Sequence, residues 1–420
     1  LRRAGALDAG LKALHERGYV PDLKWKTMVT TDADGIQSVF VWRALGREVY
    51  HMLIGKDLAP PHWEVRLASF RGDVAERAEE WQAWITGDRA SWRVRHVLPD
   101  GRNGASLDET PARTLAHDEL RHRFHMDPAV LKEVSAVSAK HPARLDWTFT
   151  FADTAPPRLK QGERRIAVEV SGDRVSDAYR FVFVPEDWQR KYRGENAQLR
   201  VLTLIRVMVV AVVFILSAAF GIVAWTRRTF PVGFAMRFFA LMTVLNVVGA
   251  INRWPEIEAG FSTAQPYDLQ LGINIIGRTL GLLVVGAVFA LIAGWCQSEL
   301  PSSGQPRAPL GIALAVGATA AGFMVAIGRL STASGPLLGD FSSAQALAPW
   351  GDQAVAAGVD LLRRATGLLA VITLARSIGA GGARVRPLVV ALLFVVGGLV
   401  AMPPGAASPA SWFALVALTG

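Results

Sequence analysis

The clearest pattern in the chain is an uncharged apolar run from Val207 to Trp225. It has nineteen residues, and Ser217 carries its single hydroxyl. A helix of that length spans about 28 Å at a rise of about 1.5 Å per residue, which is close to the thickness of the hydrocarbon core of a bilayer. Arg206 precedes the run and Arg227 and Arg228 follow it, where long basic side chains reach the lipid headgroups. The pattern predicts a transmembrane helix.

Apolar segments continue after this run, so residues 191–420 are predicted to form an all-α, multi-pass membrane domain of six or more helices. The fifth segment is interrupted by Asp360, Arg363 and Arg364. The predicted spans lie at about residues 202–225, 234–251, 271–295, 309–327, 355–378 and 387–402, and a seventh begins near residue 411.

Residues 1–190 carry shorter patterns, which predict an α+β domain. Residues 7–17 have leucines at helical spacing, whereas residues 62–70 and 91–98 alternate between apolar and polar as strands do. The acidic segment 74–85 lies between those two strands. It is expected to be a short exposed helix or a loop.

The same order of elements follows a second time. A helix is expected from about residue 106 to residue 124, and residues 145–151 alternate as a strand. Residues 165–184 then show two alternating runs around a Ser-Gly-Asp turn, which is typical of a hairpin. We therefore interpret the domain as two loosely repeated helix-strand-hairpin units, at about residues 5–102 and 106–184.

Basic residues predict the orientation of the membrane domain. Residues 200–420 hold 14 Arg, no Lys and 7 acidic residues, so most of the net charge of +9 lies there. The predicted loops 226–231 and 377–386 contain Arg, whereas the loops 252–268 and 330–353 are acidic. Since arginine-bearing loops stay in the cytoplasm, the α+β domain is expected on the outer side of a bacterial plasma (inner) membrane. This outer location requires a signal peptide or signal anchor before Leu1, and we expect one there.

Composition also limits the function. Residues 1–199 carry only two more basic than acidic residues, which argues against a nucleic-acid partner. A lone cysteine, Cys296, excludes a disulfide framework, and no phosphate loop or Ser/His/Asp grouping is visible by spacing. No cofactor is expected. The expected partners are the lipid bilayer and a peptide or membrane protein, which the α+β domain would bind without catalysing a reaction.

Three histidines, His117, His122 and His125, are the weak candidates for a binding site in the α+β domain. His122 and His125 are three residues apart and could share one face of a helix. A metal site needs a further ligand, and spacing fixes none, so a solvated helix end is favoured and no metal is expected. Five tryptophans could line a groove, but aromatic residues in strands are more often core: Trp63, Trp81, Trp84, Trp92 and Trp147.

Asp360 and Arg364 are the candidate residues within the membrane domain. Ionisable groups within a bilayer are costly and often functional. At a spacing of four residues they could instead form an ion pair on an interfacial helix or a broken span. The two interpretations are held open here.

The α+β domain resembles the PepSY class of small extracytoplasmic modules in its order of elements. The order of parts over residues 145–230 resembles large bacterial members of the CPBP family of intramembrane proteases, also called CAAX-protease-like or Abi proteins. There LDWTFTF, a hairpin ending in FVFVPEDWQRKY, a first span and the pair Arg227-Arg228 follow one another. The resemblance implies an intramembrane endopeptidase, whose Glu-Glu-x-x-x-Arg motif and membrane histidines activate water.

This chain departs from that family pattern at its catalytic residues. Asp360 and Arg364 keep the acid-x-x-x-Arg spacing, but Val359 stands where the first Glu would be, and Phe394 is followed four residues on by Gly398 instead of His. No predicted span contains His or Glu. We therefore expect a non-catalytic binding or regulatory membrane protein. The alternatives are an active protease whose motifs lie beyond residue 420, and a transporter or permease.

Overall fold

The computed structural model describes residues 1–20, 25–33, 35–70, 79–156, 158–299, 336, 341–379, 395–400 and 416. The chain divides into two compact units. The sheet unit comprises Leu1–Gln189, Asn252–Ile275 and Gly335–Trp350, and the helical unit comprises Arg190–Ile251, Ile276–Ser334 and Gly351–Gly420.

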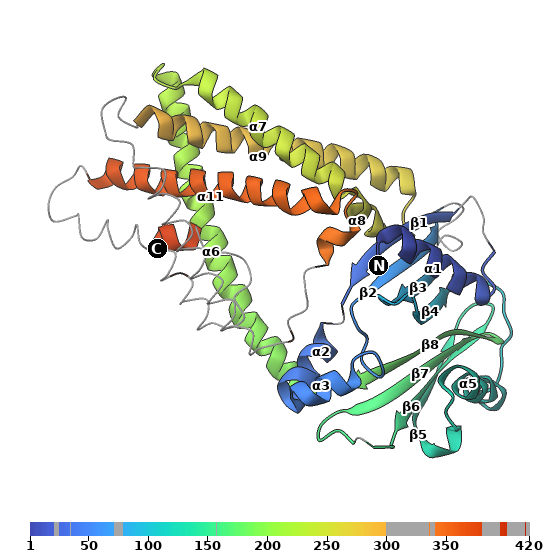
Figure 1. Ribbon diagram of the computed structural model, residues 1–420. Coiled ribbons are helices and arrows are strands. Elements are labelled where there is room, and N and C mark those ends of the chain that lie inside the picture. Colours follow the sequence, from blue (N-terminus) through green and yellow to red (C-terminus); the bar gives the residue numbers. More distant parts are fainter. Residues whose placement is uncertain are drawn as a thin grey trace. The chain divides into compact units, whose positions relative to one another are not determined.

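The sheet unit is built on one antiparallel sheet of eight strands in the order β1-β2-β3-β4-β8-β7-β6-β5 (Figure 1). Each run of four consecutive strands forms one half of the sheet, and the halves meet where Arg95 of β4 pairs with Asp177 of β8. The strands are β1 Trp25–Asp32, β2 His62–Ser69, β3 Glu80–Ile85, β4 Ser91–Val97, β5 Leu131–Lys140, β6 Leu145–Asp153, β7 Glu163–Ser171 and β8 Arg174–Phe183.

One helix precedes each run of strands and packs on it. Helix α1 (Arg3–Glu16) buries Leu14 against β1–β4, and α5 (Glu109–Phe124) buries Leu120 against β5–β8. Alternate strand residues face these helices, as period-two burial requires. Since Val94 packs with α1 and Ala178 with α5 on either side of the Arg95–Asp177 pair, both helices cover the same face of the sheet.

Three short helices connect β1 to β2 and pack near the last strand. They are α2 (Ile36–Phe40), the π-helix η1 (Val41–Leu45) and α3 (Arg47–Leu53). Phe40 and Leu53 are fully buried in a cluster with Val182 of β8 and with Val184, which lies between β8 and the first long helix. This cluster fixes the point at which the chain leaves the sheet.

The predicted fold class holds at the coarse level, an α+β region followed by a helical region, but two strands were not predicted. The segment 74–85 was expected to be a helix or a loop. Residues 80–85 instead form β3, with Ala83 and Ile85 buried, and residues 71–78 lie outside the described part. Strand β5 was not predicted because most of its side chains are exposed on both faces, so it lacks the alternation of a half-buried strand.

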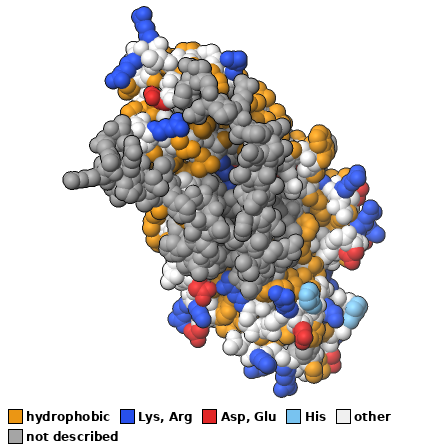
Figure 2. All heavy atoms as spheres, turned by 60° about the vertical axis from the view of Figure 1, so that its left-hand side comes forward, with side chains coloured by type: hydrophobic (Ala, Val, Ile, Leu, Met, Phe, Trp, Pro, Cys, Tyr) orange, Lys and Arg blue, Asp and Glu red, His pale blue; other side chains and the backbone are white. Residues whose placement is uncertain are grey.

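The helical unit supports the prediction of membrane-spanning helices at the coarse level. Three of its helices are long and apolar enough to cross a bilayer: α6 (Glu186–Thr226), α7 (Val232–Asn252) and α9 (Tyr267–Glu299). Many of their large apolar side chains are exposed, among them Met208, Ile215 and Ile276. Figure 2 shows hydrophobic side chains over much of the described surface of the helical region, while charged side chains gather over the sheet region.

The remaining predicted spans have mixed outcomes. The fifth segment is helical within α11 (Pro349–Gly379), which is not among the three spanning candidates. The fourth predicted span, at 309–327, lies outside the described residues. Of the predicted span at 387–402 only residues 395–400 are described, and of the seventh segment only residue 416.

Small residues allow the long helices to pack closely. A Cβ atom added at Gly221 of α6 would lie 2.9 Å from the carbonyl oxygen of Leu291 in α9. A Cβ atom at Gly294 would overlap the ring of Phe230, which packs in the same cluster as Trp295. Glycine at helix contacts is typical of membrane helices, where packing replaces the hydrophobic effect as the driving force.

Candidate functional site

Two segments that leave the helical region and return to it belong to the sheet unit. The first is the connection between α7 and α9, which contains the short helix α8 (Trp254–Ala259). The second contains the 3-10 helix η4 (Ser342–Gln345) and precedes α11. Both contact the β1 end of the sheet.

Arg66 of β2 holds the first segment by its backbone. Its Nη1 atom donates hydrogen bonds to the carbonyl oxygens of Ala259, at 3.0 Å, and Phe261, at 2.9 Å. Its Nε and Nη2 atoms donate to Glu80 of β3 at 2.8 Å and 2.5 Å. Glu80 in turn accepts a hydrogen bond from the hydroxyl of Thr263 at 3.1 Å. The planar guanidinium thus joins two strands to the connection with its fixed set of donors.

The surroundings of this pair exclude most solvent. The side chains of Arg66 and Glu80 are 14% and 12% exposed. Phe261 is 3% exposed and packs in a cluster with Met28, Ala68 and Phe70. Since a bidentate arginine–carboxylate pair is strengthened by charge and by low dielectric, the pair and the phenylalanine together fix the connection on β1 and β2.

The second segment completes the edge of β1. The backbone N–H of Thr31 donates to the side-chain oxygen of Gln345 at 3.0 Å, and the Thr31 hydroxyl donates to the carbonyl oxygen of Phe341 at 3.2 Å. Gln345 is 6% exposed. An edge strand leaves a row of backbone groups without partners, and here distant parts of the chain satisfy some of them.

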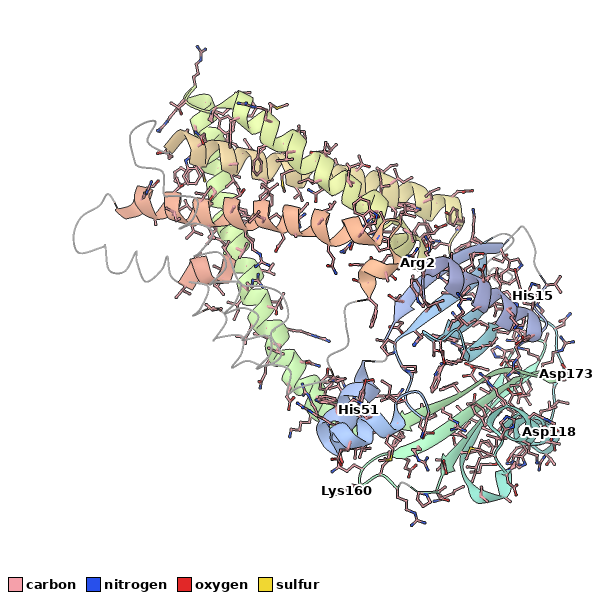
Figure 3. All side chains as sticks on the ribbon, in the orientation of Figure 1. Arg2, His15, His51, Asp118, Lys160 and Asp173 are labelled. Carbon is pink, nitrogen blue, oxygen red and sulfur yellow. The ribbon has the colours of Figure 1, made fainter. Side chains whose placement is uncertain are left out.

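A cavity of about 610 Å³ lies on the helix-covered face of the same sheet, near the contact of β4 with β8. It is bounded by the end of α1, by α5 and by the turn between β7 and β8. In Figure 3, Asp173 of that turn is labelled between His15, near the end of α1, and Asp118 of α5. The cavity therefore lies where the two halves of the sheet meet.

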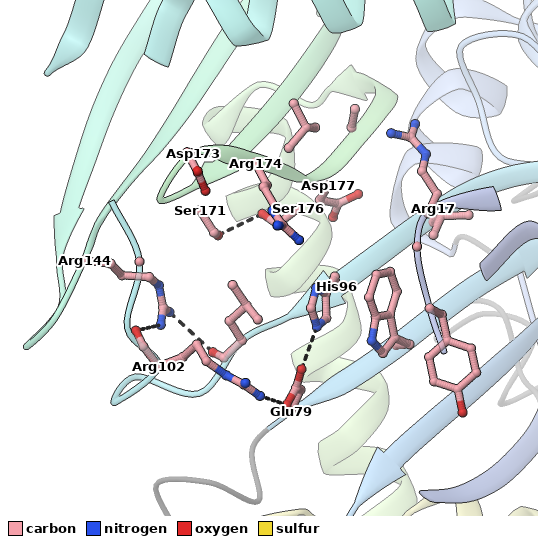
Figure 4. Close-up of a pocket in the computed structure, with 18 of the residues that line it drawn as sticks. Arg17, Glu79, His96, Arg102, Arg144, Ser171, Asp173, Arg174, Ser176 and Asp177 are labelled. Atoms are coloured by element: carbon pink, nitrogen blue, oxygen red, sulfur yellow. Dashed lines mark hydrogen bonds and ion pairs between the residues drawn. The ribbon is translucent and has the colours of Figure 1, made fainter. Parts of the chain in front are cut away.

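A chain of polar groups runs along one wall of the cavity (Figure 4). His96 of β4 lies 3.0 Å from the carboxylate of Glu79, which also pairs with Arg102. The ring of Trp81 stacks on His96 with centroids 3.7 Å apart. Burial by itself would raise the pKa of Glu79, but the bonds and charges of His96 and Arg102 outweigh it and lower that pKa.

Arginines dominate the remaining walls. Arg17, after α1, donates to Glu119 of α5 at 2.5 Å, and Arg123 of α5 donates to the carbonyl oxygen of Trp92 at 3.3 Å. The Nη1 atom of Arg123 lies 3.6 Å from Glu119 and is buried without a hydrogen bond to the described residues. Burial, followed by the nearby charge of Arg17, lowers the pKa of Arg123.

The predicted histidines do not line this cavity. His117 is half-buried, with its ring 5.6 Å from that of Phe151, and burial lowers its pKa. His122 and His125 are exposed, and His125 takes a left-handed conformation where it ends α5. Within the described residues no group of three His, Cys, Asp or Glu side chains is placed to hold a metal ion.

The tryptophans have separate roles and do not form one groove. Trp63 is core, at 6% exposed, and Trp147 donates from its indole nitrogen to the carbonyl oxygen of Leu107 at 2.9 Å. Trp81 lines the cavity, whereas Trp84, three residues away on the other face of β3, lies 4.6 Å from the guanidinium of Arg93. Trp92 contributes its carbonyl oxygen to Arg123.

In the helical unit, Asp360 and Arg364 form an ion pair at 2.7 Å along α11. The Asp360 side chain is 56% exposed, and Arg363 beside it donates to the side-chain oxygen of Asn246 in α7 at 3.0 Å. The carboxylate is therefore already paired with a cation, and a polar contact joins α11 to α7. Phe394 lies outside the described residues.

Sequence reasoning did not find the residues of either site. Glu79 and Glu80 lie in the segment 74–85, which was predicted as a helix or loop, and the strand β3 that separates their side chains begins at Glu80. The short alternation Trp81, Ala83, Ile85 was the available signal. A search of family models, curated proteins and solved structures finds no match to this chain, so the two sites stand on their geometry.

Proposed function

We propose that this chain is a bacterial inner-membrane protein in which an extracytoplasmic α+β domain docks on the loops of a multi-pass helical domain and regulates it. The hydrogen bonds from Arg66 to the carbonyl oxygens of Ala259 and Phe261 carry this proposal. A domain that binds the connections between helices in this way would stabilise one arrangement of those helices.

The order of crossings supports the docking. If α6 and α7 each cross the bilayer once, the chain returns after two crossings to the side on which it began. The connection after α7 must then lie on the same side as the sheet, and it packs against β1 and β2. Both segments of the sheet unit that come from the helical region are the acidic, arginine-poor loops of the sequence, which favours the outer side.

Hydrogen exchange of the full chain in nanodiscs tests the docking, with an Arg66→Ala variant. Removal of the guanidinium frees the carbonyl oxygens of Ala259 and Phe261 and leaves Glu80 as a buried unpaired carboxylate. We expect the amides of residues 253–266 to exchange at least tenfold faster than in the unchanged protein. The measurement is peptide-level mass spectrometry at a fixed pH.

An Arg165→Ala variant is the matched control. Arg165 lies on β7 in the other half of the sheet and pairs with Glu163 on its own strand at 2.8 Å. It should leave exchange at residues 253–266 unchanged. Equal exchange of that segment in the Arg66→Ala protein and in the unchanged protein would contradict the docking proposal.

The orientation is tested by cysteines placed on either side. A cysteine at Asp100, in the loop between β4 and α5, should react with an impermeant thiol reagent in intact cells. One at Thr229, between α6 and α7, should react only after the membrane is opened. The native Cys296 is buried, so the unchanged protein is the control for background labelling. The reverse pattern would place the sheet unit in the cytoplasm.

The resemblance to the CPBP family leads us to infer a protein without protease activity. Its spans have no Glu or His in the family's motif positions, and the 2.7 Å ion pair supports a structural role for Asp360, because a neighbouring cation weakens a carboxylate as a base. Purified chain should not cleave membrane-anchored or prenylated peptides. Cleavage that is lost on Asp360→Ala but retained in Asp352→Ala would overturn this inference.

The two runs of strands, each led by a helix, also support the proposal that the domain consists of two loosely repeated units of PepSY type. Trp63 and Trp147 lie on the second strand of each run. A superposition of the Cα atoms of the two units is the direct test. If it cannot bring α1 onto α5 while it brings β1–β4 onto β5–β8, the repeat is refuted.

A further inference from the structure

We propose that the cavity between α1 and α5 binds a carboxylate ligand that carries an aromatic ring beside its carboxylate. This site is separate from the docking of the loops. Its walls come from the segment after α1, from α5, from the central strands and from Trp25 at the start of β1. The docked segments instead contact Thr31 at the other end of β1 and Arg66 of β2.

The cavity has the size and the mixed walls of a small-molecule site. About 610 Å³ falls within the range of about 300–1,000 Å³ that is typical of ligand pockets. One side is aromatic: the ring of Tyr19 lies 6.0 Å from that of Trp25 and 5.9 Å from that of Trp81. A flat ring would be buried against such a wall with favourable stacking geometry.

The charges of the lining favour an anion. Five arginines line the cavity against three carboxylates, those of Glu79, Asp173 and Asp177. Two of these carboxylates are already neutralised. Glu79 is held by His96 and Arg102, and Asp177 accepts from Arg93 at 2.9 Å, a residue outside the lining. Arg17 and Arg123 share Glu119, and Arg144 pairs with Asp146, so the balance that remains is a small positive one.

One of the arginines has donors available for a ligand. Arg123 is not that residue, because its Nη1 atom is buried 3.6 Å from Glu119 and its other bond goes to the carbonyl oxygen of Trp92. Arg174, at the start of β8, makes no ion pair with the described residues, and Figure 4 shows it beside Ser176 and Asp177 at the cavity. A carboxylate matches guanidinium geometry and would satisfy the donors of Arg174.

Calorimetry tests the site by measuring the binding of N-acetyl-L-phenylalanine to the full chain in nanodiscs. Its neutral amide has the same ring and lacks the charge. We expect the acid to bind at least tenfold more tightly than the amide. A tetrapeptide that ends in phenylalanine with a free carboxylate distinguishes a peptide terminus from a small acid as the ligand, and either one supports the site. Inorganic phosphate, which has no ring, should bind at least tenfold more weakly than the acid.

An Arg174→Gln variant separates this cavity from other sites on the protein. Arg174 is exposed, so its loss should leave the fold intact while weakening binding of the acid about tenfold. Arg121→Gln is the matched control, since Arg121 is an exposed arginine of α5 paired with Asp118 outside the cavity. Equal binding of acid and amide, no binding of the acid, or equal loss in both variants would overturn the proposal. The Arg66→Ala protein should keep its affinity, so failure of the docking proposal would be seen separately.

Discussion

The two outer strands of the sheet are protected in different ways. Strand β1 is covered by residues about 190 to 315 positions later in the sequence, through Arg66 of the neighbouring strand and through Thr31. Strand β5 has no such cover in the described part of the chain, and Val137 on it is 59% exposed. An open edge strand can pair with another chain and aggregate, so each of the two outer strands needs protection.

Strand β5 is protected by its own sequence. Lys132 and Lys140 lie near its ends, and a bulge between Glu133 and Ser135 disturbs the pairing with β6. Charged residues and bulges are the usual means by which an edge strand avoids pairing with another chain. The comparison shows that β5 is protected by local features, whereas β1 depends on contacts with the connections of the helical region.

The largest effect is expected from Phe261→Ala, on the face of β1 and β2 that the connection between α7 and α9 covers. Phe261 is 3% exposed among Met28, Ala68 and Phe70, so truncation removes buried area and leaves a cavity. We expect the free energy of unfolding of the sheet unit to fall by about 3–5 kcal/mol. Urea titration of the full chain in detergent, followed by tryptophan fluorescence, measures it.

Val137→Ala on β5 is the matched substitution at the open edge. Because this side chain is mostly exposed, we expect a change within about 0.5 kcal/mol. If the two substitutions had the same effect, the β1 edge would not depend on the connection between α7 and α9, and the comparison of the two edges would fail.

A smaller, pH-dependent effect on the stability of the sheet unit is expected from Glu64, which lies on β2 beside the covered strand β1. Burial raises the pKa of this carboxyl, and Arg66 only partly offsets the rise. A carboxyl with a raised pKa binds its proton more tightly in the folded state. The sheet unit therefore loses stability as pH rises from the ordinary glutamate pKa through the raised one. A Glu64→Gln protein should lack this loss and be at least as stable as the unchanged protein at neutral pH.

The control for this prediction is Glu16→Gln, at an exposed position at the end of α1. It should leave the pH profile of unfolding unchanged. Urea titrations between pH 4 and pH 8 distinguish the two variants. A profile for Glu64→Gln that kept the full slope of the unchanged protein would show that another group causes it.

Some features of this protein are determined locally and could be predicted from the sequence. The apolar run 207–225 lies within α6, because a helix satisfies its own backbone hydrogen bonds and its nineteen uncharged residues match the thickness of a bilayer. The hairpin of β7 and β8 follows from its alternation and its Gly172 turn, where φ is +65°. Helix α5 also begins and ends close to the predicted residues.

Other features were decided only by the tertiary structure. Glu79 and Glu80 are neighbours in the sequence, yet one meets His96 at the cavity and the other meets Arg66 and Thr263 at the docked connection. The local pattern of apolar and polar residues predicts which face of a strand a side chain occupies. It does not predict which distant backbone contacts that side chain. The bond from Arg66 to Phe261 joins residues 195 positions apart, and it forms only because the strands and the long helices bring those residues together.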